Sequence, residues 1–310
     1  MNKRPLHKKL RDDFFYILVL LFIRILRLTP RRPALAFMRL MGRLAFLAAR
    51  APRQRAITHL ARVYGEEMSA GQIKALARAV FIHFATAAGD VLRMPNLIRN
   101  DINKLVTTVQ GIEHLDRALK DRRGLIMVTC HFGNWELLGA WLAQNGYPMR
   151  GVATGLFDPR LDKILNKTRN SAGYSNIARG KGTREIIRTI KKGEVVGMLI
   201  DQDTKAQGVF VDFFGKPAHT PYGPAVLARR LEVPIIPIFM YLKDDFTYSV
   251  ECQPPLELVK TDDEKNDITA NTQKISDSYE AMIRRYPEQW AWMHKRWKNQ
   301  PPPADNRPEN

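Results

Sequence analysis

Cysteine is scarce in this chain of 310 residues, which contains only Cys130 and Cys252. Two cysteines cannot form a disulfide framework, and such low usage is typical of a protein in a reducing compartment. The seven histidines are scattered, and neither a C-x2-C nor an H-E-x-x-H pattern occurs. We therefore expect no structural metal site.

Acidic residues are almost missing from the N-terminal part of the chain. Residues 1–62 contain fifteen Lys or Arg and two acidic residues, and so carry +13 of the total charge of +18. The other 248 residues carry +5, the balance of an ordinary globular domain. Because 45% of the chain is apolar and 9% aromatic, the composition excludes wholesale disorder.

No apolar run is long enough by itself to span a membrane. The longest in the basic region is FFYILVLLFI, residues 14–23, whereas a spanning helix needs about 20 apolar residues. No small-x-small cleavage site follows, so we expect an uncleaved segment. In residues 32–50, arginines at positions 32, 39, 43 and 50 share one helical face and nearly all other residues are apolar. This pattern predicts a helix that lies in an anionic membrane surface.

Two other interpretations of the basic region remain open. It could form a helical hairpin that packs on the rest of the protein with a solvated basic edge. It could also bind nucleic acid, but a helix with Phe, Leu and Ile around most of its circumference leaves little surface for phosphate contacts. No nucleic-acid-binding motif is present either, so we expect no nucleic-acid partner.

The remainder of the chain alternates buried apolar strands with helices. This alternation predicts an α/β fold of three layers, with a mostly parallel or mixed sheet between helices. We expect helices at 53–64 and 70–94, the second opened by a capping box of Ser69 and Gln72. The expected strands are 105–109, 124–130, 149–153, 195–200, 234–241 and 248–252. The expected later helices are 112–121, 135–145, 159–172, 182–192, one after Pro221, and 266–285.

The predicted organisation has three parts. Basic, apolar anchoring helices occupy residues 1–50, and the α/β domain occupies residues 51–300. That domain divides into a helical part, 51–103, and an α/β part, 104–300. Residues 301–310 form a polar, proline-rich tail that we expect to be disordered.

The segment most suggestive of chemistry is HFGNWE, from His131 to Glu136, between a buried strand and a helix. Ligands bind at such junctions in open α/β sheets. A short loop could let Glu136 hold the imidazole of His131 in one tautomer, the usual arrangement of a general base. Backbone N–H groups at the helix start, including those of Gly133 and Asn134, could stabilise an oxyanion or hold a phosphate. Cys130 should point to the opposite side of the strand, into the core.

HFGNWE resembles the His-x4-acid motif of the bacterial lipid A biosynthesis acyltransferases, which are related to the glycerolphosphate acyltransferases. Three further segments resemble that family in the same order. They are LNKTRN at 165–170, IDQD at 200–203 and PEQWAWMHKRW at 287–297. The resemblance extends to the N-terminal helix and so covers nearly the whole chain.

The resemblance implies an α/β fold of the glycerolphosphate acyltransferase type and transfer of a fatty acyl group to a hydroxyl of a lipid A precursor. The donor would be acyl carrier protein or, less often, coenzyme A, with no further cofactor. The place would be the cytoplasmic face of the bacterial inner membrane, in contact with anionic lipids. His131 would take the hydroxyl proton, Glu136 would orient it, and no acyl-enzyme would form.

Three other residues are candidates for substrate contacts. The resemblance implies that Arg169 contacts a phosphate or sugar, for which a guanidinium fork is suited; alternatively it is an exposed helix residue. Asp201 and Asp203 follow a strand end and could contact His131 or sugar hydroxyls, or simply form a turn. The tryptophans at 290–297 could form an interfacial belt or pack in the core.

Two alternative functions remain. The chain could acylate a lysophospholipid or another glycolipid, because enzymes that acylate mannosylated phosphatidylinositol share the His-x4-acid core. Glu rather than Asp at position 136 favours lipid A over a lysophospholipid as the acceptor. The chain could instead be a basic, membrane-associated binding protein without enzymatic activity, which would leave HFGNWE without a purpose.

Overall fold

The computed structural model describes residues 6–120, 122–156, 158–180 and 182–301. The tail predicted at 301–310 lies outside the described residues except for Pro301. The helices are α1 (Leu6–Leu28), α2 (Arg31–Ala48), α3 (Arg50–Tyr64), α4 (Ala70–Leu92), α5 (Met94–Arg99), η1 (Ile102–Lys104), α6 (Ile112–Lys120), α7 (Trp135–Gln144), α8 (Pro159–Ser171), α9 (Thr183–Lys191), α10 (Gly223–Leu231), α11 (Glu264–Arg285) and η2 (Pro287–Gln289). The strands are β1 (Val106–Gln110), β2 (Leu125–Thr129), β3 (Met149–Ala153), β4 (Ser175–Ala178), β5 (Val195–Leu199), β6 (Gly208–Asp212), β7 (Pro217–Pro221), β8 (Ile235–Leu242) and β9 (Tyr248–Cys252).

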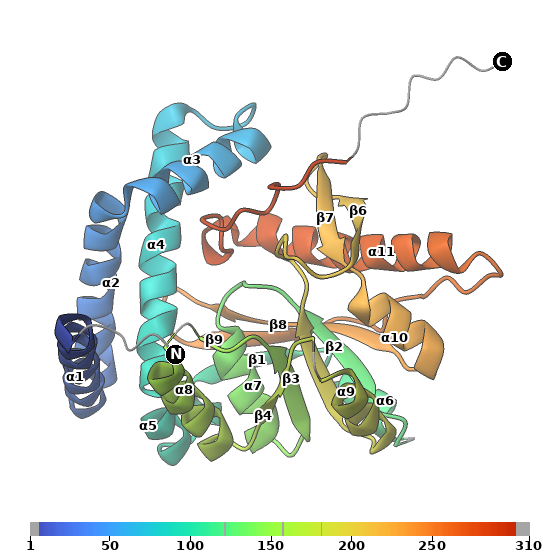
Figure 1. The fold of residues 1–310 in the computed structure, drawn as a ribbon, viewed down its shortest axis with the longest axis horizontal. Coiled ribbons are helices and arrows are strands. Elements are labelled where there is room, and N and C mark those ends of the chain that lie inside the picture. The colour runs from blue at the N-terminus through green and yellow to red at the C-terminus, as the bar shows by residue number, and fades with distance from the viewer. Residues whose placement is uncertain (1–5, 121, 157, 181, 302–310) are drawn as a thin grey trace.

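Seven strands form the main sheet, in the order β1-β9-β8-β2-β5-β3-β4. All neighbouring pairs are parallel except β8 and β9, which are antiparallel. Helices cover both faces of the sheet (Figure 1). This confirms the predicted α/β class with a mostly parallel sheet.

Strand β2 lies in the middle of the sheet and is buried on both faces. Its side chains alternate between two hydrophobic cores. Leu125 and Met127 pack with the residues of α7, whereas Ile126 and Val128 pack with those of α9, α10 and α11. This double burial explains why the strand is an uninterrupted apolar run, and it holds the segment that follows on a rigid base.

Two elements of the sheet region were not predicted. The edge strand β4 is only four residues long, and the hairpin β6–β7 forms a separate antiparallel pair beside α11 (Figure 1). Short strands with partly exposed, polar residues give a weak alternation signal.

The N-terminal helices form a layer against α4 (Figure 1). The capping box predicted at Ser69 and Gln72 is present at the start of α4. Helix α3 begins at Arg50 rather than after Pro52, because proline is tolerated in the first turn, where its missing N–H has no helical partner. A Cβ atom on Gly42 of α2 would lie 2.7 Å from the Cα of Ile82, so a glycine is required for this close approach to α4.

Helix α4 is the one described helix that is long and apolar enough to cross a membrane. However, it packs against α1, α2 and α3 and contains the buried polar residues His83 and Asp90. We therefore interpret it as a core helix.

Most of the exposed large apolar side chains of the described part of the chain lie on α1 and α2. They are Phe14, Phe15, Ile17, Leu18, Leu20, Leu21, Ile25, Leu28, Phe37, Leu40, Met41, Leu44 and Leu47, here called the hairpin apolar face. Large exposed apolar surface on a protein often marks an interaction site.

Candidate active site

His131 and Asp201 lie at the same edge of the sheet. The strands β2 and β5 are parallel neighbours, in register from Leu125 opposite Val195 to Thr129 opposite Leu199. Because His131 comes two residues after β2 and Asp201 two residues after β5, the two side chains meet. This edge is where ligands bind in open α/β sheets.

The carboxylate of Asp201 holds the backbone and the ring of His131 at once. Its Oδ1 lies 2.8 Å from His131 Nδ1, and its Oδ2 accepts the His131 backbone N–H at 2.9 Å. The indole Nε1 of Trp290 donates to the same Oδ2 at 2.9 Å. Asp201 is only 1% exposed. Its burial alone would raise its pKa, but the contacts with His131 and Trp290 outweigh burial and hold the pKa at about 2.

The opposite ring nitrogen, Nε2, is the one available for chemistry. The side chain of His131 is 25% exposed, and among the described residues none forms a hydrogen bond with Nε2. The ring also contacts that of Trp135, with centroids 5.0 Å apart. A carboxylate on Nδ1 fixes the tautomer that leaves Nε2 unprotonated, which is the arrangement of a general base.

The loop between β2 and α7 needs a glycine. Gly133 has φ of +58°, and a Cβ atom there would lie 1.8 Å from the carbonyl oxygen of Met240. The peptide N–H of Gly133 donates to Gln289 O at 2.9 Å, and that of Asn134 donates to Met240 O at 3.1 Å. These two N–H groups are therefore occupied, so the prediction that they bind an oxyanion or phosphate is wrong for this structure.

The side chain of Asn134 is also occupied. It is 2% exposed, and its Oδ1 caps α7 by accepting the Leu137 N–H at 3.1 Å. Its Nδ2 donates to Tyr248 Oη at 3.1 Å. The structure thus gives Asn134 a role in holding the loop and leaves its polar atoms no freedom for a substrate.

Glu136 contacts Arg169 and Tyr174 and does not contact His131. Arg169 Nε donates to Glu136 Oε2 at 2.7 Å, and Arg169 Nη2 pairs with Oε1. Tyr174 Oη donates to Oε2 at 2.7 Å. In the described parts of the chain no hydrogen bond or ion pair joins Glu136 to His131. The prediction that Glu136 orients His131 is therefore corrected. Glu136 pairs with Arg169 of α8, and Asp201 is the carboxylate that contacts the His131 ring.

Arg169 is 7% exposed, so it is not an exposed helix residue. Its third nitrogen, Nη1, lies 3.3 Å from Asn166 Oδ1. Since all three guanidinium nitrogens have protein partners, the structure pairs Arg169 with Glu136 and leaves no free fork for the phosphate that the resemblance implied.

Asp203 lies beside the C-terminal segment. Its carboxylate accepts from the backbone N–H and the Nδ2 of Asn299, each at 2.7 Å, and its Oδ1 is 3.5 Å from His219 Nδ1. The last distance is too long for a good hydrogen bond. Asp203 thus fastens residue 299 and does not contact His131.

Cys130 and the tryptophans are core residues. Cys130 is fully buried, and burial together with Asp201 raises the pKa of its thiol well above the usual value, as expected for a structural cysteine. Trp290, Trp292 and Trp297 are between 0 and 6% exposed, so the interpretation as an interfacial belt is wrong. The contact of Trp290 with Asp201 was not predicted. The sequence feature that could have indicated it is the PEQW segment, which resembles the family.

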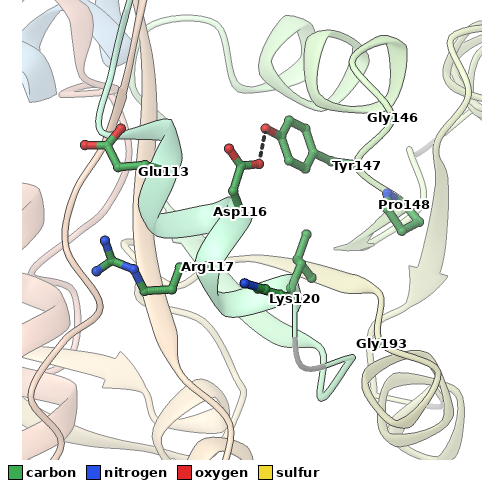
Figure 2. Close-up of a pocket in the computed structure, with 9 residues that line it drawn as sticks. Glu113, Asp116, Arg117, Lys120, Gly146, Tyr147, Pro148 and Gly193 are labelled. Carbon is green, nitrogen blue, oxygen red and sulfur yellow. Dashed lines mark hydrogen bonds between the residues drawn. The ribbon is translucent and has the colours of Figure 1, made fainter.

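A hollow of about 690 Å³ (Figure 2) has neither His131 nor Asp201 among its lining residues. It is bordered by α6 and by Pro148 and Gly193, which precede β3 and β5 and so mark the opposite edge of the sheet. The side chains that line the hollow include acidic and basic residues. Asp116 accepts a hydrogen bond from Tyr147 Oη at 2.7 Å. Among the described residues no group of three His, Cys, Asp or Glu side chains is arranged to hold a metal ion.

Comparisons with known proteins show which family the chain belongs to. The chain is 28% identical over 243 residues to a phosphatidylinositol mannoside acyltransferase of Mycolicibacterium smegmatis, an alignment that covers 77% of each chain. It is 31% identical over 196 residues to the lipid A biosynthesis palmitoleoyltransferase of Escherichia coli, covering 62% of each chain. It is 25% identical over 283 residues to the lipid A biosynthesis myristoyltransferase of the same species, covering 89% of this chain and 84% of the relative.

These relatives are all acyltransferases, and the chain is an enzyme of that kind, active in the biosynthesis of lipid A or related glycolipids. Residues 2–299 match the family described as bacterial lipid A biosynthesis acyltransferase. This match covers nearly the whole sequence and includes all four segments discussed above. The chain belongs to the bacterial lipid A biosynthesis acyltransferase family.

Proposed function

We propose that the protein transfers a fatty acyl group from the thioester of acyl carrier protein, or of coenzyme A, to a hydroxyl of a lipid A precursor. The observation that carries the mechanism is the contact of Asp201 with His131 Nδ1 at 2.8 Å, with Nε2 facing away from it. The carboxylate is fixed by three donors, so the ring is held before substrate binds.

In the proposed reaction, His131 Nε2 takes the proton of the acceptor hydroxyl as the oxygen attacks the thioester carbonyl. The tetrahedral intermediate collapses, the C–S bond breaks, and the thiolate leaves with the proton returned by the imidazolium. Asp201 stabilises the imidazolium by its negative charge. No acyl-enzyme forms, and no metal or further cofactor takes part.

The proposed location is the cytoplasmic face of the bacterial inner membrane. The hairpin apolar face would enter the lipid, and exposed arginines of α1 and α2, such as Arg24, Arg32 and Arg43, would contact anionic headgroups. The attraction is about 1 kcal/mol for each basic residue near the surface. An acidic carrier protein would approach this basic protein by charge complementarity, so the encounter should weaken with ionic strength.

The mechanism is tested by His131→Ala in purified enzyme supplied with acyl carrier protein thioester and a tetra-acylated lipid A precursor. We expect thiol release to fall by about two to four orders of magnitude, because general-base assistance is lost. Turnover near that of the unchanged enzyme would contradict the mechanism.

A second acceptor class is favoured by a specific observation, the similarity to a mannoside acyltransferase over 77% of the chain. Offering the lipid A precursor, a phosphatidylinositol mannoside and a lysophospholipid side by side would rank the acceptors by kcat/KM. Preference for either of the latter two would replace lipid A as the substrate and keep the mechanism.

A further inference from the structure

A chain of buried and partly buried polar side chains joins the N-terminal hairpin to the catalytic loop. It starts at Arg31, the first residue of α2, whose Nε and Nη2 donate to the two carboxylate oxygens of Asp90 at 2.9 and 2.7 Å. Asp90 lies near the end of α4 and is 0% exposed. A fully buried carboxylate held by a two-pronged guanidinium is a geometrically demanding contact.

Tyr248, on β9, continues the chain. Its hydroxyl donates to Asp90 Oδ2 at 2.8 Å and accepts from Asn134 Nδ2 at 3.1 Å. The hydroxyl has one proton, which it donates to Asp90, so it can only accept from Asn134. This order, together with a donation from Nδ2 to Ala87 O of α4 at 3.3 Å, fixes the amide of Asn134 with Nδ2 toward Tyr248. Its Oδ1 is thereby turned to the Leu137 N–H at the start of α7.

Asn134 is part of the loop that carries His131. The residue before it, Gly133, accepts a hydrogen bond on its carbonyl oxygen from His83 Nε2 of α4 at 3.1 Å. The residue after it, Trp135, contacts the His131 ring. A displaced Asn134 would therefore move both neighbours that shape the surroundings of the imidazole.

The other end of the chain lies where the hairpin turns. Arg93, just after α4, donates to the carbonyl oxygens of Leu26 and Thr29, and Asn96 Nδ2 donates to Arg27 O at 2.9 Å. Arg93 and Asn96, which follow α4, thus fasten the corner between α1 and α2. The corner between α1 and α2 is therefore held to the core close to Arg31, which begins α2.

We propose that Asp90 and Tyr248 are positioning residues that link the seating of the α1–α2 hairpin to the geometry of the catalytic loop. The inference rests on the proposed function, in which the hairpin binds the membrane and His131 is the base. Neither residue contacts His131, so both act through Asn134. Because of this link, a shift of the α1–α2 hairpin would change the position of the catalytic loop.

The variant that cuts the link is Tyr248→Phe, which removes one hydroxyl and leaves the ring and the Arg31–Asp90 pair in place. We expect kcat to fall roughly ten- to a hundredfold, with KM for donor and acceptor unchanged, because the loop is misplaced by a fraction of an ångström. The matched control is Tyr64→Phe. Tyr64 is 4% exposed, and its hydroxyl has no hydrogen-bond partner among the described residues. An equal loss of kcat in both variants would overturn the proposal.

A second measurement does not depend on activity. Hydrogen exchange of the Leu137 amide should accelerate in Tyr248→Phe and not in Tyr64→Phe, while the amides of α4 stay protected in both. Unchanged exchange at Leu137 would overturn the proposal. If the unchanged enzyme acylated none of the acceptors, the proposed function would fail, and this measurement would still decide the positioning role.

The link to the hairpin is tested by Arg31→Gln, alone and combined with Tyr248→Phe. If both residues act through one chain, the second change adds little to the loss of kcat caused by the first. Losses that multiply would show two independent effects and overturn the link. Should Arg31→Gln not fold, Arg31→Lys replaces it, since lysine keeps the charge but not the two-pronged contact.

Discussion

At the scale of single residues, the two acids near His131 have different roles. Asp201 holds the imidazole, whereas Glu136 neutralises the buried Arg169. Asp201 contacts the His131 ring, whereas Glu136 is near His131 only in sequence. Substituting each acid in turn therefore separates a catalytic effect from a structural one.

Asp201→Asn should lower kcat by about two to four orders of magnitude, because an amide neither fixes the tautomer nor stabilises the imidazolium. Glu136→Gln should instead lower the free energy of unfolding by about 3 kcal/mol, because it leaves the Arg169 guanidinium buried without its carboxylate. Steady-state kinetics and chemical denaturation of both variants measure the two effects. The assignment would be wrong if Glu136→Gln, still folded, lost more activity than Asp201→Asn.

Trp290→Phe should reduce kcat about tenfold, since the Asp201 carboxylate loses an N–H donor worth about 1.5–3 kcal/mol. The control is Trp292→Phe in the same segment, because Trp292 is equally buried but donates to the carbonyl of Pro287 at 2.6 Å. Kinetics of the two purified variants give the comparison. Equal losses would mean that aromatic packing, and not the bond to Asp201, is what matters.

At the scale of elements, helices α1 and α2 join two surfaces of opposite character. One side packs on α4 through residues such as Ala34 and Met38, and the other exposes the hairpin apolar face. Deleting residues 1–50 would remove both surfaces and expose the core of α4. Substitutions on the exposed side are therefore the sharper test of membrane binding.

Changing Leu40, Leu44 and Leu47 together to Ser should weaken binding to anionic vesicles at least tenfold, because each leucine side chain is worth about 1.5–3 kcal/mol when buried in an apolar environment. All three are 47–66% exposed, so the fold should keep its stability. Co-sedimentation with vesicles measures the binding. Val109→Ser, at an exposed apolar residue of β1, is the control and should bind normally. Undiminished binding of the triple variant would favour a hairpin that only packs on the protein.

At the scale of the whole molecule, buried neutral histidines should make the fold sensitive to acid. Burial lowers the pKa of both His59 and His83 to about 4, even though each ring contacts a backbone carbonyl. In the unfolded chain their pKa is about 6.5. Between these values the unfolded state binds more protons, so stability is complete above pH 6.5 and falls as the pH drops toward 4.

At pH 5 the loss from His83 alone should be about 2 kcal/mol relative to pH 7.5. Urea unfolding at the two pH values measures it, and His59→Gln should make the dependence shallower. A stability that is constant between pH 7.5 and 5 would contradict the buried, neutral state of these rings. The depressed pKa of Asp201 adds a further loss only below pH 4, as the pH falls toward 2.

Much of the fold was predictable because its strands are strongly apolar. Three strands are buried on both faces, and each appears in the sequence as an apolar run between helices: β2, β5 and β8. The short β4 and the hairpin β6–β7 were missed because partly exposed strands lack that contrast. His131 was predictable because it follows such a strand directly.

The sequence by itself determined the fold class, the basic N-terminus with its apolar helices, the base candidate and the family resemblance. These depend on local composition and on residues adjacent in the chain. Only the tertiary structure decided which carboxylate holds His131, because Asp201 is seventy positions away and reaches the ring through the parallel pairing of β2 and β5. Likewise, only folding brings Arg31, Asp90, Tyr248 and Asn134 into one chain of bonds, since a buried polar group takes its partners from whichever segments pack around it.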